Sequence, residues 1–270
     1  MRILTDATEV TRKGGALLAR TGAFASVSGI AGTGFQAYAR ILHPARIDHP
    51  GDVIGVGDST RCTWAQIADV TGRRIHPLVQ WSGLVGGVSR RWDRFDACLP
   101  DGSRVTIDEG VFAPEDLAQL LSVLGPFTAT RDELIAAIWN GWGNWCRADN
   151  AVDGRLPGLA ADGPHFAWPG RDMVLFETSI AELSDPDYGF VWKIGWERGQ
   201  YNYPTPNMLW SADLSWVVAS EIDWAWTIVA GRRALIDAVV DDPRFEAAEV
   251  SADDLLTFDS DTINPASQPK

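Results

Sequence analysis

Hydrophobic and polar positions repeat with the period of a helix in some stretches of the chain and with that of a strand in others. Residues 113–125 are the clearest helix, because four leucines between positions 117 and 124 fall on one face behind Pro114 at the first helical position. Residues 92–99 and 103–108 alternate with period two on either side of a Pro-Asp-Gly turn. That pattern predicts a β-hairpin.

The same reasoning places the remaining elements. It predicts strands at 35–42, 172–178 and 245–250, and helices at 63–70, 130–141 and 232–242. Thr63 with Gln66, and Thr130 with Glu133, have the spacing of capping boxes at the starts of two of these helices. Residues 148–170 are rich in Gly and Pro, which predicts a long loop.

Helices and strands therefore interleave without regular βαβ spacing, which predicts an α+β fold with a mostly antiparallel sheet and packed helices. We expect an N-terminal segment over residues 1–34, followed by a single α+β domain over 35–258. This domain could consist of two lobes, 35–125 and 126–258. Residues 259–270 are polar and rich in Ser, Asp and Pro, which predicts a disordered tail.

Tryptophan is concentrated in the later part of the chain, since ten of the 13 Trp residues lie between Trp139 and Trp226. From Trp216 onward apolar residues alternate with polar ones, and the length of this stretch predicts a bend or turn near Asp223. If the alternation holds through the turn, the rings lie in the core and the carboxylates point away from it. The main interpretation is thus a structural core built on Trp210, Trp216, Trp224 and Trp226, and the alternative is a stacking platform for a ligand.

Candidate site residues come from this same region. Trp142 and Trp145 lie among Gly and Asn in "IWNGWGNW", which predicts part-exposed rings in a loop, and with Trp210 they are the candidate binding residues. Asp213, Glu221 and Asp223 are the candidate acid/base residues. A solvated sheet face explains these carboxylates equally well.

Sequence motifs of common cofactor and catalytic sites are missing. The chain has no P-loop, H-E-x-x-H, C-x-x-C or G-x-S-x-G motif, so we expect no cofactor. Three of the four histidines precede proline, and His43 and His76 match no ligand template even with Asp52 or Asp58 nearby. The three cysteines are widely spaced, which predicts free thiols and no metal site.

Charge is distributed unevenly along the chain. Residues 1–94 carry 12 basic and 7 acidic side chains, a net of +5, whereas residues 95–270 carry 11 and 29, a net of −18. Because an acidic surface repels phosphate groups, we expect no nucleic-acid partner and a protein partner of basic character. No apolar stretch approaches the ~20 residues that span a bilayer, so we expect no membrane partner and a cytoplasmic location.

Four blocks of the chain resemble a family of uncharacterised actinobacterial proteins. They are "FQAYARILHPAR" at 35–46, "WAQIADVTGRRIHP" at 64–77, "PGRDMVLF" at 169–176 and "PNMLWSADLSWVVASEIDWAWTIVAG" at 206–231. The resemblance covers under half of the chain and implies that blocks from both halves belong to one structural unit. It implies no activity, cofactor or catalytic residue.

Two functions are consistent with these patterns. The first is a non-enzymatic partner-binding protein, immunity-like or regulatory, that uses exposed aromatic side chains and its acidic half. The second is a hydrolase or transferase that acts on a small polar substrate through carboxylates in a Trp-lined cleft. The missing catalytic motifs favour the first.

Overall fold

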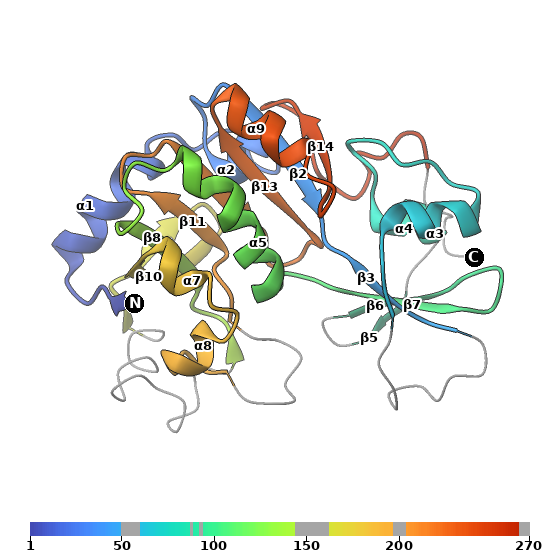
Figure 1. The fold of residues 1–270 in the computed structure, drawn as a ribbon, viewed down its shortest axis with the longest axis horizontal. Helices are drawn as coiled ribbons and strands as arrows, with labels where there is room; N and C mark the ends of the chain where they lie inside the picture. Colours follow the sequence, from blue (N-terminus) through green and yellow to red (C-terminus); the bar gives the residue numbers. More distant parts are fainter. Residues whose placement is uncertain (50–59, 87–88, 92–93, 144–161, 197–203, 265–270) are drawn as a thin grey trace.

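The protein is described by a computed structural model that covers residues 1–49, 60–86, 89–91, 94–143, 162–196 and 204–264, with only the backbone of 89–91 and 94–96. The chain forms two lobes joined by two strands that run side by side (Figure 1). The large lobe comprises residues 1–44 and 109–250, and the small lobe comprises residues 45–108. Residues 251–264, which we call the C-terminal strap, return from the large lobe to the small one. The α+β class and the mostly antiparallel pairing are confirmed.

A nine-stranded antiparallel sheet forms the large lobe. The strands lie in the order β1-β10-β8-β11-β12-β13-β2-β14, and β9 pairs with β10. Their bounds are β1 Arg2–Ile3, β2 Ala37–Leu42, β8 Leu134–Trp139, β9 Phe166–Trp168, β10 Arg171–Thr178, β11 Met208–Ser211, β12 Trp216–Ser220, β13 Trp226–Gly231 and β14 Glu246–Val250. Because β1 pairs with β10, the first residues belong to this lobe and are not a separate N-terminal segment.

Both faces of the central strands are buried under other elements. One face packs against α1 (Ala7–Leu18), α2 (Val27–Ala31) and the small lobe. The other packs against α5 (Pro114–Leu124), α7 (Ile180–Leu183) and α9 (Arg233–Val240), with η1 (Gly125–Phe127) and α8 (Tyr188–Val191) beside them. In Figure 1 the second group lies in front of the sheet. Strands covered on both faces are mostly apolar, and β13 is buried over its whole length.

The small lobe is a five-stranded antiparallel sheet with two short helices. The strands lie in the order β4-β3-β7-β6-β5. Their bounds are β3 Ala45–Asp48, β4 Thr60–Cys62, β5 Ser89–Arg91, β6 Arg94–Cys98 and β7 Arg104–Asp108, and the helices are α3 Trp64–Thr71 and α4 Trp81–Val85. The predicted hairpin is confirmed as β6 and β7. The lobe boundaries differ from 35–125 and 126–258, because β2 and α5 belong to the large lobe.

Most elements form where their local signals predict them. At α3 the capping box of Thr63 and Gln66 is present in full, and Gly72 ends the helix with φ 66°. The helix at 113–125 is confirmed as α5, and that at 232–242 as α9. The strands predicted at 35–42, 172–178 and 245–250 are confirmed as β2, β10 and β14.

The predicted helix at 130–141 is wrong. Residues Leu134–Trp139 form β8, which pairs with β10 on one side and with β11 on the other. Five of its six residues are buried. A buried strand and a buried helix both have a continuous run of apolar residues, so the sequence pattern does not distinguish them. Thr130 and Glu133 instead close a turn, in which the Glu133 N–H donates to the Thr130 carbonyl at 3.0 Å.

Two further predictions change in part. The loop predicted over 148–170 contains β9, and its residues 148–161 lie outside the described part of the chain. The predicted tail is packed over residues 259–264, where Asp261 and Asn264 are 6% and 2% exposed. The polar composition of this segment predicted disorder, but its polar side chains form hydrogen bonds to the small lobe that hold it in place. No helix in the described ranges has the length and apolar character needed to cross a membrane.

Candidate functional site

A large hollow lies against the face of the large sheet that carries α2. It has a volume of about 530 Å³, and we call it the main cavity. Met173 of β10, Met208 of β11 and Ala219 of β12 line it. These residues share a face because β8 pairs with both β10 and β11, β11 pairs with β12, and side chains alternate along each strand. Thioether and methyl groups therefore make the floor apolar.

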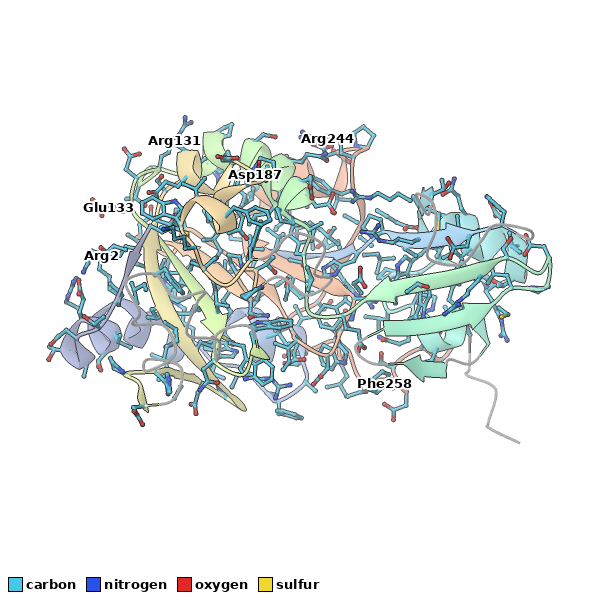
Figure 2. All side chains as sticks on the ribbon, turned by 90° about the horizontal axis from the view of Figure 1, so that it is seen from below. Arg2, Arg131, Glu133, Asp187, Arg244 and Phe258 are labelled. Atoms are coloured by element: carbon cyan, nitrogen blue, oxygen red, sulfur yellow. The ribbon has the colours of Figure 1, made fainter. Side chains whose placement is uncertain are left out.

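Exposed aromatic side chains stand at the edge of the main cavity. Phe24 is 85% exposed and Phe258 is 60% exposed, and both line the cavity. The two segments that carry them are tied together, since Leu256 N donates to the Ala25 carbonyl at 3.0 Å. Figure 2 shows Phe258 at the edge of the molecule between the two lobes. Exposed aromatic groups beside a hollow are typical of a binding site.

One wall of the main cavity carries an ion-paired cluster. Arg171 Nη2 lies 2.7 Å from Glu221 Oε1 and 2.8 Å from Asp223 Oδ2. The second Glu221 oxygen accepts a hydrogen bond from the Asp223 N–H at 2.8 Å. Burial raises the pKa of Glu221 above its usual value, against the opposing effects of that hydrogen bond and of Arg171. Arg171 Nε is buried and has no hydrogen-bond partner.

The structure brings together two of the three predicted carboxylates. Glu221 and Asp223 meet at Arg171, but Asp213 lies in the turn before β12 and accepts a hydrogen bond from Ser215 N at 3.0 Å. Five residues of β12 separate that turn from Glu221, a span of about 16 Å for an extended strand. Asp213 therefore has a local role in the turn and does not face the main cavity.

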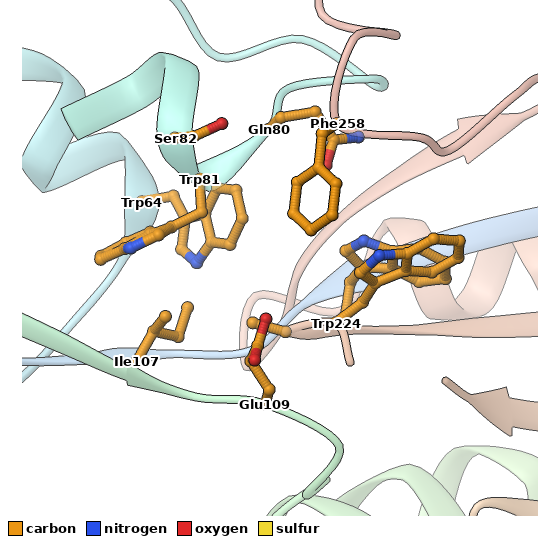
Figure 3. Close-up of a pocket in the computed structure, with 10 residues that line it drawn as sticks. Trp64, Gln80, Trp81, Ser82, Ile107, Glu109, Trp224 and Phe258 are labelled. Carbon is orange, nitrogen blue, oxygen red and sulfur yellow. The ribbon is translucent and has the colours of Figure 1, made fainter. Parts of the chain in front are cut away.

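A smaller hollow of about 80 Å³, which we call the inner chamber, adjoins the main cavity and shares Glu109, Trp224 and Phe258 with it. Trp64 and Trp81 lie on one side of it and Trp224 on the other, with Phe258 above and Glu109 below (Figure 3). Trp64 and Trp81 come from α3 and α4 of the small lobe, whereas Trp224 follows β12 of the large one. The inner chamber is therefore formed by both lobes.

Gly110 joins the segment after β7 to the turn between β12 and β13, beside the inner chamber. Its N–H donates to the Trp224 carbonyl at 3.0 Å and its φ is 70°. A Cβ atom at this position would lie 2.4 Å from the Ile222 carbonyl oxygen. This distance is shorter than a van der Waals contact, and the carbonyl oxygen belongs to the backbone and cannot easily move away.

We expect Gly110→Ala to lower the free energy of unfolding by at least about 2 kcal/mol, from left-handed strain together with the backbone clash. Urea denaturation measures this loss. Gly72→Ala is the matched control, because Gly72 has φ 66° but no atom within 4 Å of the added Cβ. Equal losses in the two variants would contradict a clash at Ile222.

The predicted core tryptophans divide into two groups. Trp210, Trp216 and Trp226 are 1%, 0% and 1% exposed, so these three are confirmed as core. Trp226 also lines the inner chamber, and the half-buried Trp224 lines both hollows. The turn between β12 and β13 shifts the alternation, because Val218 and Trp226 belong to the cores on opposite faces of the sheet.

Two of the three predicted binding residues, Trp142 and Trp210, do not line either hollow. Trp210 is buried, and its ring centroid lies 5.6 Å from that of Phe166, so it is not available to a partner. Trp142 is half-buried and donates from Nε1 to Asn207 Oδ1 at 3.3 Å. Trp145 lies outside the described residues.

Sequence reasoning missed most of the residues that line the two hollows. Arg171, Glu109, Phe24 and Phe258 are far apart in the chain and match no motif. Only the strand alternation of 172–178, extended by one residue, places Arg171 on the same face as Met173. Trp64 starts a predicted helix, but nothing in its neighbourhood indicates what its ring contacts.

The histidines considered as metal ligands have other partners. His43 is buried, and its Nε2 pairs with Thr227 Oγ1 at 2.8 Å, while His76 pairs with Asp261. Burial first, and then the charges of Arg40 and Arg61, lower the pKa of His43 to about 3. Asp52 and Asp58 lie outside the described residues, and the described residues hold no cluster of three or more ligand side chains suited to a metal ion.

Comparison of the chain with protein-family models, curated proteins and solved structures finds no match. The resemblance to the actinobacterial family therefore stays a prediction. Function is therefore inferred from the geometry of the two hollows.

Proposed function

We propose that the protein is a non-enzymatic binding protein, and that its ligand is a small molecule whose apolar part occupies the main cavity. The observation that carries the proposal is the cavity itself, about 530 Å³ in volume with Met173, Met208 and Ala219 on its floor. Ligand sites of proteins are typically hollows of about 300–1,000 Å³ with mostly apolar walls and a few polar groups.

Charge narrows the kind of ligand. The charged residues around the two hollows, among those described, are Glu109, Glu221, Asp223 and Arg171, three acids against one base. The formal charge of −2 disfavours an anionic ligand and favours a neutral or cationic one. The acidic character of the later part of the chain likewise led to the expectation of a basic protein partner and of no nucleic-acid partner.

The neutral fluorophore N-phenyl-1-naphthylamine tests the proposal, because its emission rises when it leaves water for an apolar site. We expect saturable binding with a Kd on the order of 10 µM, which follows from about 0.4 kcal/mol per non-hydrogen atom for a probe of this size. Ala219→Phe places a ring on the cavity floor and is expected to weaken binding at least tenfold. Fluorescence titration measures both values.

Val191→Phe is the matched control, since it adds the same ring at a side chain that is 62% exposed and does not line the cavity. Circular dichroism checks that each variant is folded. If Ala219→Phe does not fold, Phe24→Ala at the exposed rim replaces it, with an expected loss of about threefold. Absence of saturable binding to the wild type, or equal binding by the folded cavity variants, would overturn the proposal.

A hydrolase or transferase is the second candidate function, and one observation favours it. Glu221 and Asp223 meet on the wall of the main cavity, and burial raises the pKa of Glu221 in the direction that a general acid needs. Arg171 lies between the two carboxylates and pairs with both. A substrate would have to displace it to reach them, which makes binding without chemistry the better-supported function.

A further inference from the structure

We propose that the inner chamber is an aromatic cage for an alkylated ammonium group. The inference rests on the proposed function, because the chamber opens beside the main cavity and would hold the head group of the same ligand. The ligand would then be an amphiphilic cation. The ammonium group would lie among the indole rings, and the apolar body would lie over the floor of the main cavity.

The rings come from both lobes and surround one space. Trp64 and Trp81 pack edge to face, with centroids 5.3 Å apart and an interplanar angle of 61°. Trp224 and Trp226 pack with centroids 4.6 Å apart and an angle of 30°. The labelled rings in Figure 3 stand around the chamber on three sides, with Phe258 the one at its exposed edge.

Such a set of rings attracts a cation of low hydration. The face of an aromatic ring is negative, and a cation within about 6 Å of its centroid gains roughly 0.5–2 kcal/mol, more where water is excluded. Trp64 and Trp226 are each 1% exposed and back the chamber, whereas the half-buried Trp224 and the exposed Phe258 offer most of the ring surface that a cation can contact. The Glu109 carboxylate lines the same space and adds a negative charge.

The size of the inner chamber fits a compact group. Its volume of about 80 Å³ exceeds the ~10–15 Å³ that a single water molecule needs, so a group of a few non-hydrogen atoms can enter. Trp81 Nε1 is buried and has no hydrogen-bond partner.

The tryptophan cluster already contacts one buried cation. Arg40 is 1% exposed, and its Cζ atom lies 5.1 Å from the centre of the Trp226 ring. Burial lowers the pKa of Arg40 to about 9, while the charge of Asp261 opposes this. Arg40 adds positive charge near the chamber, and the carboxylate of Asp261 offsets it.

Choline and its uncharged isostere 3,3-dimethylbutan-1-ol separate a cation site from a simple apolar hollow. The two have the same shape, so a difference in affinity reports the charge alone. We expect choline to bind at least tenfold more tightly in titrations followed by tryptophan fluorescence and by calorimetry. Hexyltrimethylammonium should bind more tightly than choline, because its chain extends into the main cavity.

Trp224→Leu removes a ring shared by the two hollows, and Glu109→Gln removes the charge while keeping the shape. We expect losses of choline affinity of at least tenfold and of about threefold to tenfold, with less than a twofold change for the isostere. Trp192→Leu is the control, since Trp192 packs against the opposite core of the large sheet. Circular dichroism shows which variants are folded, and the wild-type comparison of the two ligands needs no variant.

The outcomes distinguish this inference from the proposed function. If wild-type protein binds the neutral fluorophore but binds choline no more tightly than the isostere, the cage is wrong and the main cavity remains a binding site. If choline binds and Trp224→Leu has no effect, the ammonium group lies elsewhere and the assignment of the chamber is wrong. Loss of binding for both probes in the wild type overturns the two proposals together.

Discussion

Replacing Asp261 with alanine is expected to lower the free energy of unfolding by about 3–5 kcal/mol, because several buried donors lose one acceptor at once. Asp261 is 6% exposed and lies in the C-terminal strap. Its Oδ1 pairs with His76 Nε2 at 2.8 Å and accepts from the Asn264 N–H at 2.7 Å. Its Oδ2 accepts from the Gln80 N–H at 3.0 Å. The side chain thus joins the strap to the start of α4.

Urea denaturation measures this loss, and Asp259→Ala, two residues away in the same strap and at the surface, is the matched control. We expect no measurable change in that control. A small effect of Asp261→Ala would show that the strap is not needed to hold the small lobe. The Gly83 position supports the close packing, since a Cβ atom there would lie 2.2 Å from the Asn264 carbonyl oxygen.

The difference in the free energy of unfolding between wild type and Asp261→Ala should depend on pH. Burial alone would raise the pKa of Asp261, but hydrogen bonds from Asn264, Gln80 and His76 outweigh it, so its pKa lies below the usual 3.8. A carboxylate whose pKa is lower in the folded state stabilises that state above the unfolded pKa. The advantage of wild type over Asp261→Ala should therefore be complete above about pH 5 and shrink as the pH falls below about 4.

Replacing Trp216 with alanine is expected to cost about 3–5 kcal/mol of the free energy of unfolding, as large-to-small changes of buried aromatic residues do. Trp216 is 0% exposed and lies in the core between the large sheet and α5. Its Nε1 donates to Thr128 Oγ1 at 2.8 Å, so the substitution leaves a cavity and also removes a buried hydrogen bond.

Thermal or urea unfolding checks this value, and two variants refine it. Trp216→Phe keeps an aromatic ring and loses the hydrogen bond, so it should cost about 1–3 kcal/mol. Trp192→Ala truncates a half-buried ring on the same side of the sheet and should cost less than Trp216→Ala. A Trp216→Ala variant as stable as Trp192→Ala would mean that this ring is not central to the core.

The local elements could be read from the sequence because their signals are short-range. The capping box at Thr63, the proline at the start of α5 and the Pro-Asp-Gly turn each act through neighbouring residues. Backbone conformation near such residues depends on a few contacts, so composition and spacing are sufficient to predict it. The α+β class follows from the sum of these elements.

Long-range pairing and the two hollows depend on the tertiary structure. The run that forms β8 is equally apolar as a buried helix or a central strand, and only its pairing with β10 and β11 makes it a strand. The sequence predicts a turn near Asp223, but the parity of β13 depends on how many residues that turn takes up, which no local signal specifies. Burial on both faces also removes the contrast between polar and apolar positions that would show which face is the core.

Tertiary structure likewise decided which side chains form the candidate site. The sequence by itself indicated a concentration of indole rings with carboxylates nearby, and it placed Trp210, Trp216, Trp224 and Trp226 in a core. It could not show that Trp64 and Trp81 of one lobe meet Trp224 of the other, since about 150 residues separate them. The physical reason is that a cavity is the space left between packed elements. Its lining depends on how whole sheets and helices pack, whereas the elements themselves depend on near neighbours.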